Sequence, residues 1–163
     1  MNPELLNREN AEGETEYFLV TPELKTEVDL KTIIYEEIIN DCNWLDEEET
    51  FLEVNYYDWD NNEMVALVSA GGELLRKGIK HVVEYIPTSR LFIIAQTGDS
   101  LGEERFDYMT DEDDHVYAVI NQYGEYVISP QHEEITFDDY ENVFEIGVGE
   151  NYARFDLLGN VAE

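Results

Sequence analysis

Positively charged residues are scarce in this sequence. It holds 9 Lys and Arg against 39 Asp and Glu among 163 residues, for a formal net charge of −30. Contact with the phosphates of DNA or RNA needs a cationic footprint, so direct nucleic acid binding is excluded as the default role. Docking on an anionic membrane leaflet is disfavoured for the same reason.

Cysteine and long apolar runs are also scarce. Cys42 is the one cysteine, which excludes a disulfide within the chain and fits a reducing compartment. Its acidic neighbours disfavour the thiolate, so we interpret Cys42 as a small buried side chain and not as a nucleophile. The longest apolar run, residues 91–95, is far shorter than the roughly 20 residues of a spanning helix, and residues 1–16 lack a secretory signal. These features predict a cytoplasmic protein, with a leaderless extracellular route as the alternative.

Recognisable catalytic and metal-binding motifs are missing. There is no G-x-S-x-G elbow, P-loop or G-x-G-x-x-G motif, and the three histidines show no metal-ligand spacing. Residues 58–63 begin like a calcium loop, but Glu63 and Ser69 stand where an EF-hand needs Gly and Glu. We therefore expect a hairpin turn there, with a weak cation site as the alternative. No catalytic residue, metal or cofactor is predicted, and a small enzyme without a readable motif stays the alternative.

Short strand-like segments dominate what is present. Apolar residues make up 43% of the chain, enough for the core of one domain, and Phe144, Ile146 and Val148 alternate with other residues as in a half-buried strand. The sequence predicts a mainly β fold of antiparallel hairpins, with one short helix near residues 30–43 and a long polar insertion over 97–115. Residues 1–16 are predicted to be a flexible acidic tail, and 17–163 a single domain.

An internal repeat organises that domain. In each copy an Ala stands six residues before a Gly, a polar residue stands three before that Gly, and another polar residue follows it. The glycines supply the positive φ of tight turns, and the hairpin units, about 35–78, 79–130 and 131–163, must stack to bury their apolar faces. The three Ala, polar and Gly sets are Ala66, Ser69 and Gly72, then Ala118, Asn121 and Gly124, then Ala153, Asp156 and Gly159.

The third copy, over residues 140–160, and residues 117–135 resemble WG-type β-repeats, which occur in bacterial proteins as tandem β-hairpin units. The resemblance covers roughly residues 35–163. The Trp-Gly pair that names the family is replaced here by Val65-Ala66, Tyr117-Ala118 and Tyr152-Ala153. The family has no established catalytic residues, so the resemblance implies an architecture and no reaction.

The acidic residues are concentrated where cations are missing. No Lys or Arg occurs over residues 32–75 or 106–153, and aromatic residues lie among the acids there, including Tyr56, Tyr57, Tyr123 and Tyr140. We predict a non-catalytic inhibitor or immunity-type protein that uses residues 41–63 and 107–150 to mask a basic protein, such as a toxin, a nuclease or another nucleic-acid-binding protein. Nucleic-acid mimicry is a subcase, and a WG-like scaffold whose acidity serves solubility is the alternative. The predicted partner-binding residues are Asp58, Trp59, Asp60, Glu63, Tyr108, Asp111, Glu112, Asp113, Asp114, Asp138 and Asp139.

Overall fold

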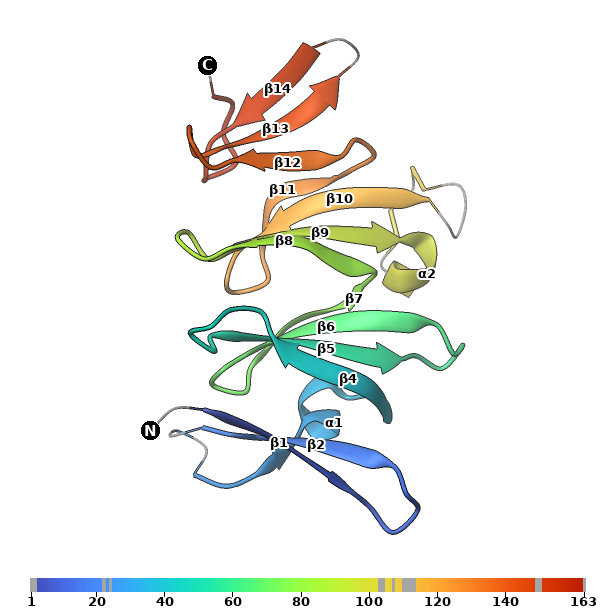
Figure 1. The fold of residues 1–163 in the computed structure, drawn as a ribbon. Helices are drawn as coiled ribbons and strands as arrows, with labels where there is room; N and C mark the ends of the chain where they lie inside the picture. Colours follow the sequence, from blue (N-terminus) through green and yellow to red (C-terminus); the bar gives the residue numbers. More distant parts are fainter. Residues whose placement is uncertain are drawn as a thin grey trace. The chain divides into compact units, whose positions relative to one another are not determined.

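The computed structural model describes residues 3–21, 23, 25–102, 105, 106, 108, 109, 114–148 and 151–162. The chain is mainly β, as the sequence predicted, and over these residues it forms four antiparallel sheets and two short helices. It divides into two compact units, Met1–Gly78 and Ile79–Glu163, where the sequence predicted a single β-repeat domain over 17–163. Figure 1 labels the strands and helices of both units. We call the two parts the N-terminal unit and the C-terminal unit.

The first sheet of the N-terminal unit contains β1 (Glu4–Glu9), β2 (Thr15–Val20) and β3 (Val28–Asp29), in that order. Glu4 pairs with Val20 and Glu9 with Thr15, so the prediction of a flexible tail over 1–16 is wrong for this strand. Leu5 packs on the first core, and the Arg8 guanidinium lies 4.2 Å from the centre of the Phe18 ring. These contacts outweigh the local acidity that suggested a tail.

Helix α1 (Leu30–Ile34) begins where Asp29 accepts a hydrogen bond from the Lys31 backbone N–H, and it ends at Tyr35, whose φ is 59°. The chain then enters β4 (Ile38–Trp44), so the predicted helix near 30–43 is right for its first part only. A register shift between Ile39 and Asp41 breaks the strand alternation. Because of that shift Ile39 and Cys42 are both buried at a spacing of three, whereas Ile38 is exposed.

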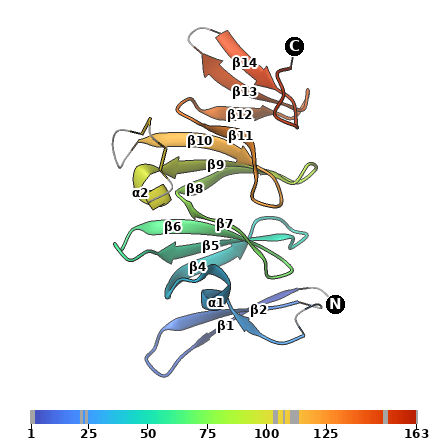
Figure 2. The same cartoon turned by 180° about the vertical axis from the view of Figure 1, so that it is seen from behind.

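The second sheet of the N-terminal unit adds β5 (Phe51–Tyr57), β6 (Glu63–Ser69) and β7 (Leu74–Ile79) to β4, in the order β4-β5-β6-β7. Its inner face shares one core with β2 and α1, and α1 lies between the two sheets (Figures 1 and 2). The core residues include Leu19, Leu30, Ile34, Leu52, Val54 and Ala66, all fully buried. The two sheets therefore stabilise each other through apolar burial.

The C-terminal unit also contains two antiparallel sheets, a four-stranded one followed by a three-stranded one. Its first sheet has the order β11-β10-β9-β8, from β8 (His81–Ile86), β9 (Leu91–Thr97), β10 (His115–Ile120) and β11 (Tyr126–Gln131). The second has the order β12-β13-β14, from β12 (Ile135–Asp138), β13 (Val143–Val148) and β14 (Asn151–Phe155). Ile93, Val119, Ile135, Phe144 and Ile146 form one core across both sheets, as expected for stacked hairpin units.

The segment predicted as a polar insertion over 97–115 contains structure in its described part. Helix α2 (Gly98–Leu101) begins with a capping box between Thr97 and Ser100. Leu101 and Met109 are buried with Val116 in a small apolar cluster. The segment predicted as a long polar insertion therefore also contributes apolar side chains to a buried cluster of its own.

The turn that closes each repeat copy has the same hydrogen bonds. The side-chain oxygen of its first residue accepts from the backbone N–H four residues on, at 2.9 to 3.1 Å. The glycine three residues on has a φ of 80° to 86°, which confirms the positive φ expected of these glycines. Ala66 and Ala118 are fully buried, whereas Ala153 is half-buried. The turns are formed by Ser69 and Glu73, Asn121 and Glu125, and Asp156 and Asn160.

Candidate partner-binding site

The predicted residues 58–63 form the hairpin turn between β5 and β6. The Asp58 carboxylate accepts hydrogen bonds from the backbone N–H groups of Asp60, at 3.0 Å, and Asn62, at 2.8 Å. Asn61 takes the left-handed position, with φ 63°. Asp58 is thus part of the turn itself, and the hairpin prediction is confirmed. The turn leaves Trp59 91% exposed, with Asp60 and Glu63 also on the surface.

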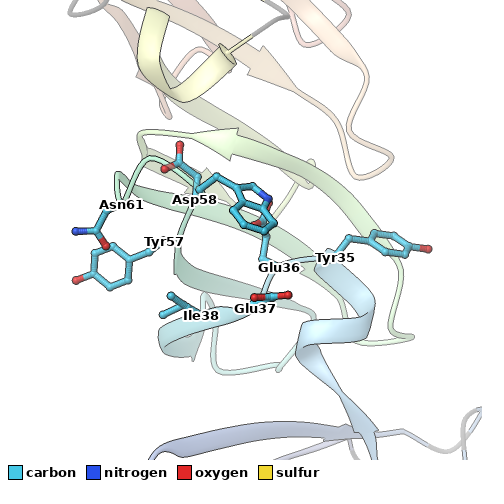
Figure 3. A pocket seen from close by; sticks show the side chains of 8 residues that line it. Tyr35, Glu36, Glu37, Ile38, Tyr57, Asp58 and Asn61 are labelled. Atoms are coloured by element: carbon cyan, nitrogen blue, oxygen red, sulfur yellow. The ribbon is translucent and has the colours of Figure 1, made fainter.

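Trp59 lines a cavity of about 280 Å³ in the N-terminal unit. One side comes from the segment after α1 and the start of β4, and the other from the end of β5 and its turn. Ile38 pairs with Tyr57 in the β4–β5 ladder, which brings the two segments together. In the view of Figure 3, Glu37 and Ile38 lie between Tyr57 and Tyr35. The lining residues are Tyr35, Glu36, Glu37, Ile38, Tyr57, Asp58, Trp59 and Asn61.

The cavity combines exposed apolar surface with carboxylates. Tyr35 is 79% exposed and Ile38 55%, beside the more exposed Trp59. Among the described residues that line it, none is Lys or Arg. Aromatic rings and carboxylates without a competing cation favour binding of a cationic side chain, whose apolar stem can pack on the rings.

Lys77 of β7 holds one wall of the cavity in place. Its ammonium donates to the Ile34 carbonyl at 3.0 Å and to the Glu36 carboxylate at 2.9 Å. Only 15% of the Glu36 side chain is exposed, so this carboxylate is already paired within the chain. Glu37, which is exposed, and Asp58 provide the remaining negative charge of the lining.

Tyr56 lies on the opposite face of β5 from this surface. The sequence analysis placed it among aromatics that face a partner, but it is only 3% exposed. Strand alternation turns it inward beside Val54, and its hydroxyl accepts a hydrogen bond from the Gly78 backbone N–H at 3.0 Å. Burial raises the pKa of Tyr56 to about 12, and the charges of Glu36 and Asp58 act in the same direction.

A second cavity of about 330 Å³ continues this surface. It shares Glu37, Ile38 and Tyr57 with the first and reaches Glu14 and Thr15 at the β1–β2 hairpin. Lys31 lines it as well, so its charge is mixed. The candidate surface is therefore larger than one side chain of a partner would cover.

In the C-terminal unit, Tyr108 is tethered and not free to reorient. Its hydroxyl donates to the Pro130 carbonyl at 2.7 Å, and its ring contacts those of Phe106 and His132. It is 44% exposed, and burial raises the pKa of its hydroxyl. Of the predicted acids beside it, Asp114 is described and half-buried. Asp111, Glu112 and Asp113 lie outside the described residues.

Asp138 and Asp139 belong to the turn between β12 and β13. The Asp138 carboxylate accepts from the backbone N–H groups of Tyr140, at 2.9 Å, and Glu141, at 3.2 Å. Asp139 is exposed, and Tyr140 is 91% exposed. This turn therefore presents an aromatic ring among acids, as the β5–β6 turn does.

The acidic stretches are not free of intrachain cations. Arg154 of β14 pairs with Glu141, and its guanidinium lies 3.8 Å from Glu145 and 3.9 Å from Asp138. Lys77 plays the corresponding part for Glu36. The fold thus brings cations from outside each stretch to carboxylates within it, which the absence of Lys and Arg from these stretches did not reveal.

Sequence reasoning missed Tyr35, Glu37 and Ile38. The sequence predicts a helix that continues past Tyr35, whereas the left-handed φ of Tyr35 ends the helix there. The run of an aromatic, two acidic and an aliphatic residue over 35–38 was a possible signal of a binding surface. Its relation to the β5–β6 turn depends on the β4–β5 register, which no local pattern specifies.

Comparison with protein-family models, curated proteins and solved structures found no match for this chain. The resemblance to WG-type repeats stays a prediction. Across the residues that the structure describes, no helix is long and apolar enough to cross a membrane. That same part of the chain has no group of three or more His, Cys, Asp or Glu arranged to hold a metal ion.

Proposed function

We propose that this chain is a non-catalytic acidic binding protein of the inhibitor or immunity type, which masks a basic surface on another protein. The observation that carries the proposal is the exposed ring of Trp59, held in an acidic turn beside a cavity with no cationic lining. The Tyr140 turn repeats the combination in the C-terminal unit. Trp and Tyr are the residues most enriched at the energetic centres of protein interfaces.

The net charge of the chain indicates a positively charged partner. A charge of −30 repels acidic proteins and nucleic acids and attracts basic proteins over long distances. The partner is accordingly a toxin, a nuclease or another nucleic-acid-binding protein, and in the mimicry subcase the carboxylates stand in for phosphates in its cationic groove. Cytoplasmic residence belongs to the same proposal, since the buried, unpaired Cys42 suits a reducing compartment.

A scaffold related to WG-type repeats is the second candidate. The stacked hairpin sheets and their common turn favour it, because repeat architectures often serve as interaction surfaces. In that case the acidity serves solubility, and no single basic partner dominates.

Affinity capture from the native host, followed by binding kinetics across a salt series, tests the proposal. One basic partner at near-stoichiometric yield is expected, with an association rate that falls steeply between about 0.05 and 0.5 M salt as the Debye length shortens. Trp59→Ala should raise the dissociation rate about tenfold or more. Leu158→Ala is the control, since Leu158 is 79% exposed in a turn outside both acidic stretches. An acidic partner, or an association rate that ignores salt, would overturn the proposal.

A further inference from the structure

We infer that the cavity beside Trp59 receives an arginine side chain of the basic protein. The inference deepens the proposed function and rests on it for the source of the arginine. Its basis is the joint presence, in one cavity of the N-terminal unit, of aromatic rings and carboxylates with no lining cation.

The electrostatics of the cavity favour a cation. Glu37 and Asp58 line it, whereas Glu36 is already paired with Lys77 and contributes little net attraction. The Asp58 carboxylate uses one oxygen for its own turn, which fixes its position. Glu37 lies outside the β5–β6 turn and is exposed, so its carboxylate is the one best placed to move toward an incoming cation.

The rings distinguish arginine from lysine. A guanidinium is planar and weakly hydrated, and it stacks on aromatic faces while it bonds a carboxylate through two N–H groups. An ammonium is a compact, strongly hydrated charge that gains less from a ring. Tyr35, Tyr57 and Trp59 supply rings in this lining, and Ile38 supplies apolar surface for the methylene stem.

The size of the surface points to a protein as the source of the arginine. The second cavity extends the surface past Ile38 to the β1–β2 hairpin. An arginine side chain seated beside Trp59 leaves the second cavity to the flanking residues of a polypeptide. A free arginine has no such flanking residues.

The test is an NMR titration of the full-length, ¹⁵N-labelled chain with two probe peptides, acetyl-Gly-Arg-Gly-amide and acetyl-Gly-Lys-Gly-amide. The arginine peptide is expected to shift the Trp59 indole N–H and the amides of residues 35–38, and to leave the Trp44 indole N–H unchanged. Its affinity should exceed that of the lysine peptide about two- to fivefold, the range expected for a cation–π contact at an exposed site. Trp59→Ala should reduce the difference in affinity between the two peptides, while Tyr35 and Tyr57 remain in the lining.

Charge-neutral variants separate this cavity from general attraction. Glu37→Gln should weaken the arginine peptide several-fold, whereas Glu48→Gln, at an exposed acid outside the cavity lining, should leave it unchanged. Equal affinity for the two peptides, or shifts spread over acids throughout the chain, would overturn the inference. If a basic partner is captured but the arginine peptide shifts nothing, the inference fails and the proposed function stands. If the peptide binds as expected but no basic partner is captured, the cavity's preference stands and the proposed function fails.

Discussion

Lys77 and Glu36 form an ion pair of 2.9 Å that fastens the segment after α1 to β7. The same ammonium also donates to the Ile34 carbonyl, the last residue of the helix. Because Glu36 is largely shielded from water, this pair sets the position of one wall of the candidate site. The wall can thus be tested through stability as well as through binding.

Lys77→Met should lower the free energy of unfolding by about 1–2 kcal/mol, since it leaves a largely buried carboxylate and a helix-end carbonyl without their donor. Urea unfolding measures the loss. Lys80→Met, at an exposed lysine three residues away, is the control and should change stability by less than about 0.5 kcal/mol. Equal effects of the two substitutions would show that the pair does not hold the segment.

Gly159→Ala should destabilise the C-terminal unit far more than its backbone angle alone explains. A Cβ at Gly159 would stand 2.1 Å from the Val127 carbonyl oxygen. Gly13 has nearly the same φ, 82° against 84°, but nothing within 4 Å of its Cβ position, so Gly13→Ala isolates the strain of the angle. We expect about 1–2 kcal/mol for Gly13→Ala and about 2 kcal/mol more for Gly159→Ala. Urea unfolding measures both losses of stability, and equal losses for the two variants would contradict the close approach of the Gly159 turn to β11.

Alkaline pH should destabilise the protein through Tyr56 and Cys42. Burial raises the pKa of each to about 12, from 10.0 and 9.0 respectively, and Asp41 adds to the shift at Cys42. The folded state thus keeps both groups neutral. Their contribution to stability is complete below pH 9 and is lost as pH rises from 9 toward 12, at up to about 1.4 kcal/mol per pH unit for each group.

Unfolding free energies measured between pH 8 and 11 test this dependence. In Cys42→Ala, the free energy of unfolding, expressed relative to the variant's value at pH 8, should fall less steeply above pH 9 than it does in the parent. Tyr123→Phe, which removes an exposed hydroxyl, is the control and should follow the parent's curve. A parent protein whose stability is constant from pH 8 to 11 would exclude this role for both groups.

Collisional quenching of fluorescence should report the charge around Trp59. The ring is 91% exposed among carboxylates, whereas Trp44 is half-buried. Local negative potential concentrates Cs⁺ and depletes I⁻ near the ring. Cs⁺ should therefore quench Trp59 more efficiently than I⁻ does, when each quencher is compared with its effect on free tryptophan amide. The preference should shrink in 0.5 M NaCl and disappear in Trp59→Phe. A preference for I⁻ would contradict the acidic surroundings of the cavity.

The sequence predicted those parts of the fold that local physics determines. The glycine turns at Gly72, Gly124 and Gly159 followed from a repeated pattern, and the strand containing Phe144 and Ile146 followed from alternation. The exposure of Trp59 also agreed with its place between two aspartates.

The failures came from pairing between distant segments. The first strand depends on Leu5 packing and on the contact of Arg8 with Phe18, which a local acidic composition does not reveal. The intrachain partners Lys77 and Arg154 lie outside the stretches whose charge they offset. Tyr35 joins the candidate site only because β4 pairs with β5 in a register that no short pattern encodes.

The common turn also bears on how this protein could be altered. Its first residue, such as Asn121 or Asp156, fixes the turn through its own side chain, while the next two residues contribute no side chain to those bonds. Other side chains at positions 122 and 123 should be tolerated without loss of the hairpin, whereas Leu157 of the third turn packs on the core. The tip of the second hairpin thus offers a permissive grafting position, at which a new binding specificity can be installed.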